Sequence, residues 1–249
     1  MPECIDLCGV IFMGYLKRFW LLYAVTAAVF VLICVKGSEA ATTMAESAPF
    51  PRQHVFVIDA GHGGEDGGAV SCTGVKESGI NLQIALRLND LMHLLGHKTV
   101  MIRTTDCSVH TGGSTIAQRK ASDLQHRAAI VRKTENSVLV SIHQNHYTES
   151  IYSGAQMFYN DVPGAQELAQ RLQEQFVTLL NPGSRRKCKP VADIYLLEHI
   201  DRPGVLVECG FLSNPEEEQR LRQADYQKKI CCVIAASLST MGLDMQTND

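Results

Sequence analysis

Apolar and polar positions follow two periods along most of this chain. Short runs of apolar, mainly β-branched residues predict buried strands at 55–59, 98–103, 137–142, 154–159, 194–197 and 205–207. Apolar residues spaced by three and four predict amphipathic helices at about 80–95, 117–133, 164–180 and 225–241. Because strands and helices alternate, we expect a single α/β domain with a mixed, mainly parallel sheet flanked by helices on both faces.

A longer apolar segment precedes this pattern. Residues 19–35 are uncharged and follow two basic residues, and as a helix they would span roughly 25 Å, slightly less than a ~30 Å hydrocarbon core. The segment predicts an N-terminal hydrophobic helix, either a membrane anchor or a cleaved signal, with residues 1–18 as its cytoplasmic flank. The domain is therefore expected outside the cytoplasm, membrane-anchored or secreted. Whether Met1 or Met13 starts the chain stays open.

Composition and charge exclude one class of partner. The 249 residues are 45% hydrophobic and carry a net charge of −3 without a basic field, so no nucleic-acid partner is expected. Small polar residues and prolines predict a linker at 36–53, which leaves 54–243 as the folded domain and 244–249 as a tail. The nine cysteines lack zinc-finger spacing and are interpreted as buried, small apolar side chains. Their redox state and the oligomeric state stay open.

Four polar residues stand where the pattern predicts an apolar residue or a turn. His62 and His143 each follow a predicted buried strand, Glu208 closes another, and Glu77 lies at the start of the first predicted helix. Two imidazoles and one carboxylate are a known ligand set for catalytic zinc, which keeps its fourth position for water. A second carboxylate can then act as the general base.

Each of these residues also has a purely structural explanation. His62 could be a structural histidine in a plain tight turn, which the neighbouring glycines suit. Glu77 suits a helix start, where a carboxylate interacts favourably with free N–H groups and the helix dipole. A lone His143 is more often a core residue than a ligand. An ion pair with an arginine would explain Glu208, because an ionised carboxylate inside a strand is costly to bury without a partner. It is the coincidence of the four that favours a metal site.

The ordered stretches VFVIDAGHGGEDGGA, GVKESGINLQIALRL, LVSIHQN and PGVLVECGFLSNPEE resemble the successive motifs of the zinc-dependent N-acetylmuramoyl-L-alanine amidases, the Amidase_3 family. The resemblance covers residues 54 to about 240. It implies that His62, Glu77 and His143 bind Zn²⁺ and that Glu208 is the catalytic base. Gln144 and Asn145, next to a proposed ligand, are predicted to orient it or the substrate.

The resemblance implies hydrolysis of the amide between N-acetylmuramic acid and L-alanine, with peptidoglycan glycan strands and their stem peptides as substrate. Within the family the chain is most similar to the small membrane-anchored CwlD type of sporulating bacteria, which implies a role in spore cortex maturation and muramic-δ-lactam formation. The alternatives are a vegetative amidase for cell separation and an extracytoplasmic zinc peptidase. An activating partner protein also stays open.

The sequence departs from the family pattern at two places. Glu65, Asp66 and Gly67 stand where Asp-Pro-Gly is common, and Cys209 stands where a small apolar residue is usual. We expect neither departure to touch a proposed ligand. Strand alternation predicts that Cys209 faces the core, away from Glu208.

Overall fold

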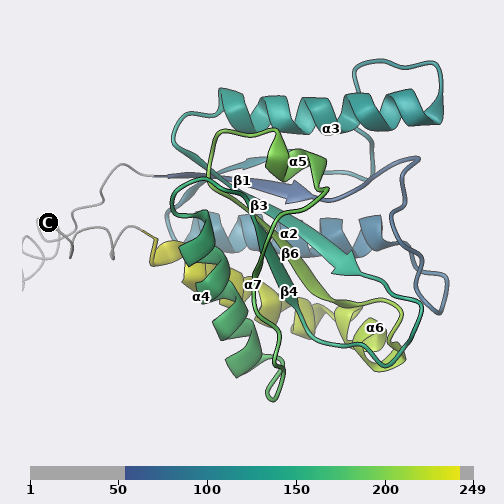
Figure 1. The fold of residues 1–249 in the computed structure, drawn as a ribbon, viewed down its shortest axis with the longest axis vertical. Helices are drawn as coiled ribbons and strands as arrows, with labels where there is room; N and C mark the ends of the chain where they lie inside the picture. Colours follow the sequence, from purple (N-terminus) through teal and green to yellow (C-terminus); the bar gives the residue numbers. More distant parts are fainter. Residues whose placement is uncertain (1–53, 242–249) are drawn as a thin grey trace, which may run out of the picture. The chain divides into compact units, whose positions relative to one another are not determined.

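The central feature of the fold is a six-stranded sheet with the strand order β2-β1-β3-β6-β4-β5 (Figure 1). The computed structural model describes residues 54–241, so the predicted hydrophobic segment, the linker and the tail lie outside the described residues. In chain order the strands are β1 (Val55–Ala60), β2 (Lys98–Met101), β3 (Ser137–Asn145), β4 (Gln156–Tyr159), β5 (Lys189–Pro190) and β6 (Gly204–Phe211). The helices are α2 (Glu77–Leu94), α3 (Ile116–Lys133), α4 (Ala165–Leu179), α5 (Tyr195–Glu198), α6 (Pro215–Leu221) and α7 (Ala224–Ser239).

The sheet is mixed and mainly parallel, as predicted. β2, β1, β3 and β6 run parallel, β4 pairs antiparallel with β6, and β5 pairs parallel with β4. Parallel neighbours need crossover connections, and α2 and α3 supply them for the first three strands. The carboxyl ends of β1, β3 and β6 therefore meet at one edge, where open α/β sheets bind ligands.

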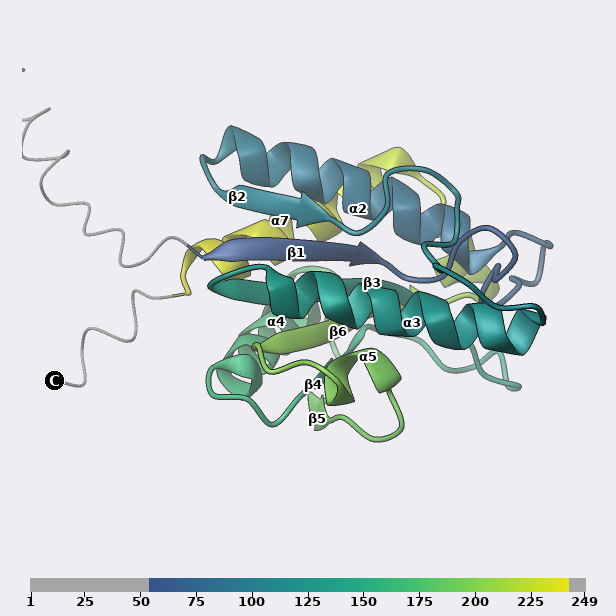
Figure 2. The same cartoon turned by 90° about the horizontal axis from the view of Figure 1, so that it is seen from above.

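Helices cover both faces of this sheet, as Figures 1 and 2 show. α2, α4 and α7 pack on one face over the larger apolar core, and α3 and α5 pack on the other over a smaller one. Successive strand residues alternate between these cores: Val138 and Val140 lie in the larger one and Leu139 in the smaller. The prediction of an α/β domain with helices on both faces is confirmed.

The same alternation decides where the polar strand residues face. Val57, Leu139 and Leu206 belong to the smaller core. Two residues further along the same strands stand Asp59, Ser141 and Glu208, and His143 follows two residues later on β3. All four line one cavity on the α3 side of the sheet. Sheet register adds to this, because His143 on β3 pairs directly with Glu208 on β6.

Several elements differ from the prediction. Residues 194–197 were expected to form a strand, but Tyr195–Glu198 is a helical turn that buries two consecutive leucines, and periodicity cannot distinguish so short an apolar run. β3 and β6 also continue beyond the apolar runs, so His143 and Glu208 lie within strands and not after them. Helix α6 was not predicted; it begins at Pro215 after an Asn214 side-chain cap.

The prediction for the cysteines is only partly right. Cys209 and Cys231 are buried, and Cys209 belongs to the larger core, as strand alternation predicts. Cys72, Cys107 and Cys232 are exposed, however. Cys232 is exposed although its neighbours in α7 are apolar and mostly buried, because burial of a thiol depends on which face of its helix carries it. Within residues 54–241, none of the helices combines the length and apolar character needed to cross a bilayer.

Candidate active site

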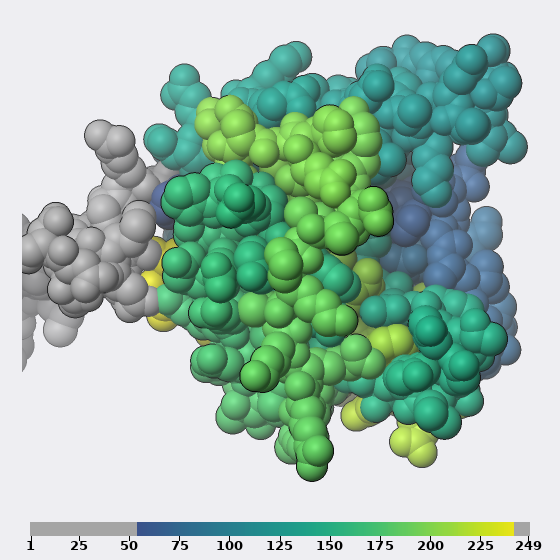
Figure 3. Space-filling model, in the orientation of Figure 1, coloured from purple at the N-terminus to yellow at the C-terminus, as the bar shows by residue number. Residues whose placement is uncertain are grey.

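A cavity of about 440 Å³ opens on the α3 side of the sheet at the carboxyl ends of β1, β3 and β6. His62, His143 and Glu208 line it together with polar residues of α3 and apolar residues of the α5 region. In Figure 3 the surface is hollowed between the α3 side of the domain and the loop that follows β3. A cavity of this size accommodates a small ligand or part of a polymer.

His62 stands in a glycine turn directly after β1. Its φ is +62°, a left-handed conformation that is uncommon for a residue with a side chain. Neighbouring glycines allow close approach: a Cβ on Gly61 would come within 2.2 Å of the His143 ring, and one on Gly68 within 2.5 Å of a Glu77 carboxylate oxygen. The turn therefore brings the backbone and the His62 imidazole against both other side chains.

Glu77, at the first position of α2, is 3% exposed and heavily hydrogen-bonded. Its Oε1 accepts from the Gln144 amide at 3.1 Å and the Asn81 side chain at 3.1 Å, and its Oε2 accepts from the Ala69 amide at 3.0 Å. Most of these donors come from outside the first turn of α2, so the carboxylate is more than a cap for its own helix. Burial raises its pKa, but contacts with both imidazoles outweigh this and hold the pKa well below the usual range.

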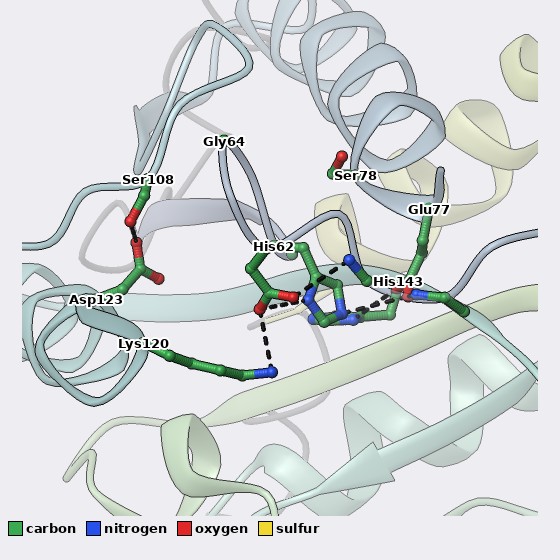
Figure 4. A network of polar contacts seen from close by, with 12 residues as sticks. His62, Gly64, Glu77, Ser78, Ser108, Lys120, Asp123 and His143 are labelled. Carbon is green, nitrogen blue, oxygen red and sulfur yellow. Dashed lines mark hydrogen bonds and ion pairs between the residues drawn. The ribbon is translucent and has the colours of Figure 1, made fainter. Parts of the chain in front are cut away.

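The carboxylate of Glu77 contacts both imidazoles (Figure 4). Its Oε2 is 3.2 Å from His62 Nε2, and its Oε1 is 3.0 Å from His143 Nδ1. One ligand atom from each residue lies within 4.8 Å of the others. Two imidazole nitrogens and one carboxylate oxygen thus converge at the wall of the cavity. This donor set suits zinc and leaves room for a further ligand.

Glu208 lies on the neighbouring strand with an unusual environment. Its Oε2 is buried and has no hydrogen-bond partner among residues 54–241. The alternative explanation, an ion pair with an arginine, does not hold among these residues, since Arg127 pairs with Asp59 and Asp123. Burial raises the pKa of Glu208 to about 7; the nearby histidines oppose the shift and Glu77 adds to it. A partly buried carboxyl at a cavity, with one buried oxygen that has no partner among the described residues, is a group available for proton transfer.

Asp66 contacts the site but was not predicted from the sequence. Its Oδ2 is 2.9 Å from His62 Nδ1, so the expectation that the departure at 65–67 touches no proposed ligand is wrong. The turn doubles back through paired backbone hydrogen bonds between Gly63 and Asp66, which puts the two side chains together. The spacing of four residues within a glycine turn was the available signal. A histidine ligand commonly donates its second ring N–H to such a carboxylate.

The Asp66 carboxylate also forms an ion pair with a lysine at the rim of the cavity. Lys120 of α3 places its Nζ 3.2 Å from the same Oδ2 (Figure 4), and Arg119 pairs at 2.8 Å with Glu65. Burial raises the pKa of Asp66, but the hydrogen bond and charge of His62, with Lys120, lower it overall. For His62, burial lowers the pKa, and contacts with Glu77 and Asp66 outweigh it and raise the pKa to about 9.

Gln144 and Asn145 lie apart from the cavity lining. The Gln144 side chain is 3% exposed, faces α2 and donates to Asn81 Oδ1 at 3.1 Å, which places it behind Glu77. This orientation follows from alternation, because its neighbour His143 faces the other side of the sheet. The carbonyl of Asn145 accepts the Leu212 amide at 2.8 Å next to an irregularity in the β3–β6 pairing. Their role toward substrate stays a prediction.

Comparison with known proteins gives a consistent picture. The family model described as N-acetylmuramoyl-L-alanine amidase matches residues 56–240. The germination-specific N-acetylmuramoyl-L-alanine amidase of Bacillus subtilis is 35% identical over 182 residues, 72% of this chain and 76% of that protein. The amidase LytC of the same organism is 29% identical over 175 residues, which is 32% of its length.

Solved structures give the same result. The CwlD amidase from Clostridioides difficile, solved in complex with the GerS lipoprotein, is similar with a TM-score of 0.72 and 36% identity, over 75% of this chain and 97% of that one. An N-acetylmuramoyl-L-alanine amidase from Clostridium difficile 630 has a TM-score of 0.66 and 29% identity, over 79% and 98% of the two chains. This chain belongs to the N-acetylmuramoyl-L-alanine amidase family.

Proposed function

We propose that this amidase uses a zinc ion and one glutamate to hydrolyse the bond between the lactyl group of N-acetylmuramic acid and L-alanine. His62, Glu77 and His143 hold the metal, and Glu208 is the general base. The observation that carries this assignment is the pairing of the converging donor set with Glu208 on the adjacent strand, whose buried Oε2 has no partner among the described residues. Family membership supplies the reaction.

The residues present fit a catalytic zinc site. Three protein donors leave a coordination position free, which distinguishes catalytic sites from closed structural ones. His62 offers Nε2 to the cluster because its Nδ1 is directed at Asp66, and His143 offers Nδ1. A zinc ion bound there supplies a Lewis acid that polarises the scissile carbonyl and lowers the pKa of the attacking water.

Glu208 then moves the proton. In its ionised form the carboxylate accepts a proton from the attacking water as the new C–O bond forms at the lactyl carbonyl carbon. The protonated carboxyl then donates that proton to the alanine nitrogen as the C–N bond breaks, which yields a lactyl carboxylate and a free amine. Burial favours this exchange, because it raises the pKa of the carboxyl above its usual range and so lets the group both accept and release a proton.

We also propose that the enzyme acts in spore cortex maturation, where removal of the stem peptide prepares muramic-δ-lactam formation. Support comes from the similarity to a germination-specific amidase and to CwlD. Because CwlD was solved in complex with a lipoprotein, a partner protein for this chain belongs to the same proposal. The hydrophobic segment 19–35 is proposed to anchor the catalytic domain outside the cytoplasm, or to export it and be cleaved.

The test compares the full-length chain with Glu208→Gln and with Glu216→Gln, an exposed glutamate at the start of α6 as the matched control. Zinc content by elemental analysis is expected to be equal in all three. Hydrolysis of cortex-type peptidoglycan is expected to fall by about 10²-fold or more in Glu208→Gln alone. Unchanged hydrolysis in that variant, or a wild type that binds no zinc, would contradict the proposal.

A further inference from the structure

Two buried arginines converge on the turn that carries His62. Arg103 donates from Nε to the Ala60 carbonyl at 2.8 Å and from Nη2 to the Gly61 carbonyl at 3.1 Å. Arg127 donates from Nη1 to the same Ala60 carbonyl at 3.0 Å and from Nη2 to the His62 carbonyl at 2.8 Å. All three carbonyls of residues 60–62 are thus bound by guanidinium groups.

The two arginines come from different parts of the fold. Arg103 follows β2, is 3% exposed, and also donates to the Ser78 carbonyl at 2.9 Å, next to Glu77 at the start of α2. It therefore ties the His62 turn to the segment that presents the Glu77 carboxylate. Arg127 lies on α3, is 2% exposed, and is held by ion pairs with Asp59 and Asp123.

The turn needs such support because His62 has the left-handed φ of +62°. A residue with a side chain persists in this conformation only where its surroundings determine it. The planar guanidinium suits this task, since it presents several donors in a fixed fork to more than one acceptor, whereas an ammonium is a flexible point charge. Both guanidinium groups reach this turn through its backbone carbonyls, so they act on the imidazole through the backbone.

We propose that Arg103 and Arg127 form a clamp that holds the 60–62 turn with the His62 imidazole directed at Glu77 before the metal arrives. They are positioning residues for metal binding and contact neither the metal nor the scissile bond. The inference rests on the proposed function, because it assigns His62 to the metal. Preorganisation of a ligand lowers the conformational cost of binding, so the loss of the clamp lowers metal affinity.

The test measures the zinc dissociation constant of full-length protein by chelator competition. Arg103→Lys and Arg127→Lys keep the charge and remove the fork; each is expected to weaken zinc binding by about tenfold or more. Arg132→Lys is the matched control, because Arg132 also lies on α3 and donates to a backbone carbonyl, that of His199, on the far side from the turn. Its zinc affinity is expected to equal that of the wild type.

A second control separates positioning from loss of stability. Val131→Ala removes buried packing from α3 without touching the turn, so it lowers the thermal midpoint and leaves zinc affinity unchanged. The proposed clamp would be overturned if both lysine variants bound zinc within twofold of the wild-type affinity. It would also be overturned if Val131→Ala lost as much zinc affinity as the lysine variants. A wild type that binds no zinc would instead overturn the proposed function.

Hydrogen exchange of the wild-type backbone amides tests the clamp without relying on any variant to fold. In wild-type protein without metal, a peptide covering residues 60–64 is expected to be about as protected from exchange as in the zinc-loaded protein, because the clamp exists beforehand. In the folded lysine variants, protection is expected to fall in the metal-free form. Protection that arises only after zinc is added to the wild type would refute the proposal.

Discussion

Replacing Asp66 by asparagine tests how the site depends on the residues behind its ligands. The substitution keeps an oxygen that can accept from His62 Nδ1 but removes the negative charge, which turns a charge-assisted hydrogen bond into a neutral one. That difference is about 1–2 kcal/mol. About a third of the Asp66 side chain is exposed, so solvent screening favours the lower end of the range. The expected loss is therefore about 1 kcal/mol, or roughly fivefold in zinc affinity.

The assay is competition against a chelator of known zinc affinity, followed by hydrolysis at saturating zinc. Glu65→Gln is the matched control, since it removes the same charge one residue earlier, where the carboxylate pairs with Arg119 and does not contact His62. Asp66→Asn is expected to regain most activity once zinc saturates the site. The reasoning is refuted if Asp66→Asn binds zinc as tightly as wild type, or if Glu65→Gln loses as much affinity.

Three further outcomes are expected. In the metal-free protein the pKa of His62 is raised to about 9, so at pH 7 the imidazole holds a proton that zinc must displace. The apparent zinc affinity should therefore rise with pH up to about 9. Calorimetry in buffers of different ionisation enthalpy should show that zinc binding releases protons. Buffer-independent heats would contradict this. Gly61→Ala drives a Cβ to within 2.2 Å of the His143 ring and should abolish zinc binding, whereas Gly79→Ala, with open space around it, should bind normally. Burial raises the pKa of Asp59, but its arginine partner and a serine hydroxyl lower it overall, below 3.8. The ionised Asp59 carboxylate stabilises the folded state above about pH 4, and this stabilisation is lost as the pH falls through the lower pKa of the folded protein. Between pH 5 and 3 the thermal midpoint of Asp59→Asn should therefore fall less than that of the wild type. Parallel curves of midpoint against pH would contradict this expectation.

The elements of the α/β fold could be predicted from the sequence wherever the apolar and polar periodicity extends over many residues. The helices α2, α3, α4 and α7 and most strands were predicted within a few residues because amphipathic periodicity extends over several turns. The short apolar run at 194–197 carries no such signal, and burial of Leu196 and Leu197 by the α3 side decides its helical form. Tertiary packing, absent from local sequence, determines such short elements.

The candidate site was predictable where its residues interrupt apolar strands. His143 and Glu208 carry that signal, and strand alternation with parallel register is enough to bring them side by side. Asp66 offers only its spacing of four residues from His62, and Arg103 offers no signal, because a carboxylate in a glycine turn and an arginine after a strand are ordinary surface residues until the chain folds. Their burial and contacts depend on distant segments, such as the start of α2 for Arg103.

This chain is expected to cut the amide between muramic acid and L-alanine. Mass spectrometry of cortex-type peptidoglycan digested with the zinc-loaded, full-length chain tests it directly. We predict released stem peptides that begin with a free L-alanine amine, together with glycan whose muramic acid carries no peptide. Glycan that still carries L-alanine, with cleavage inside the stem peptide, would contradict the claim and identify a peptidase instead.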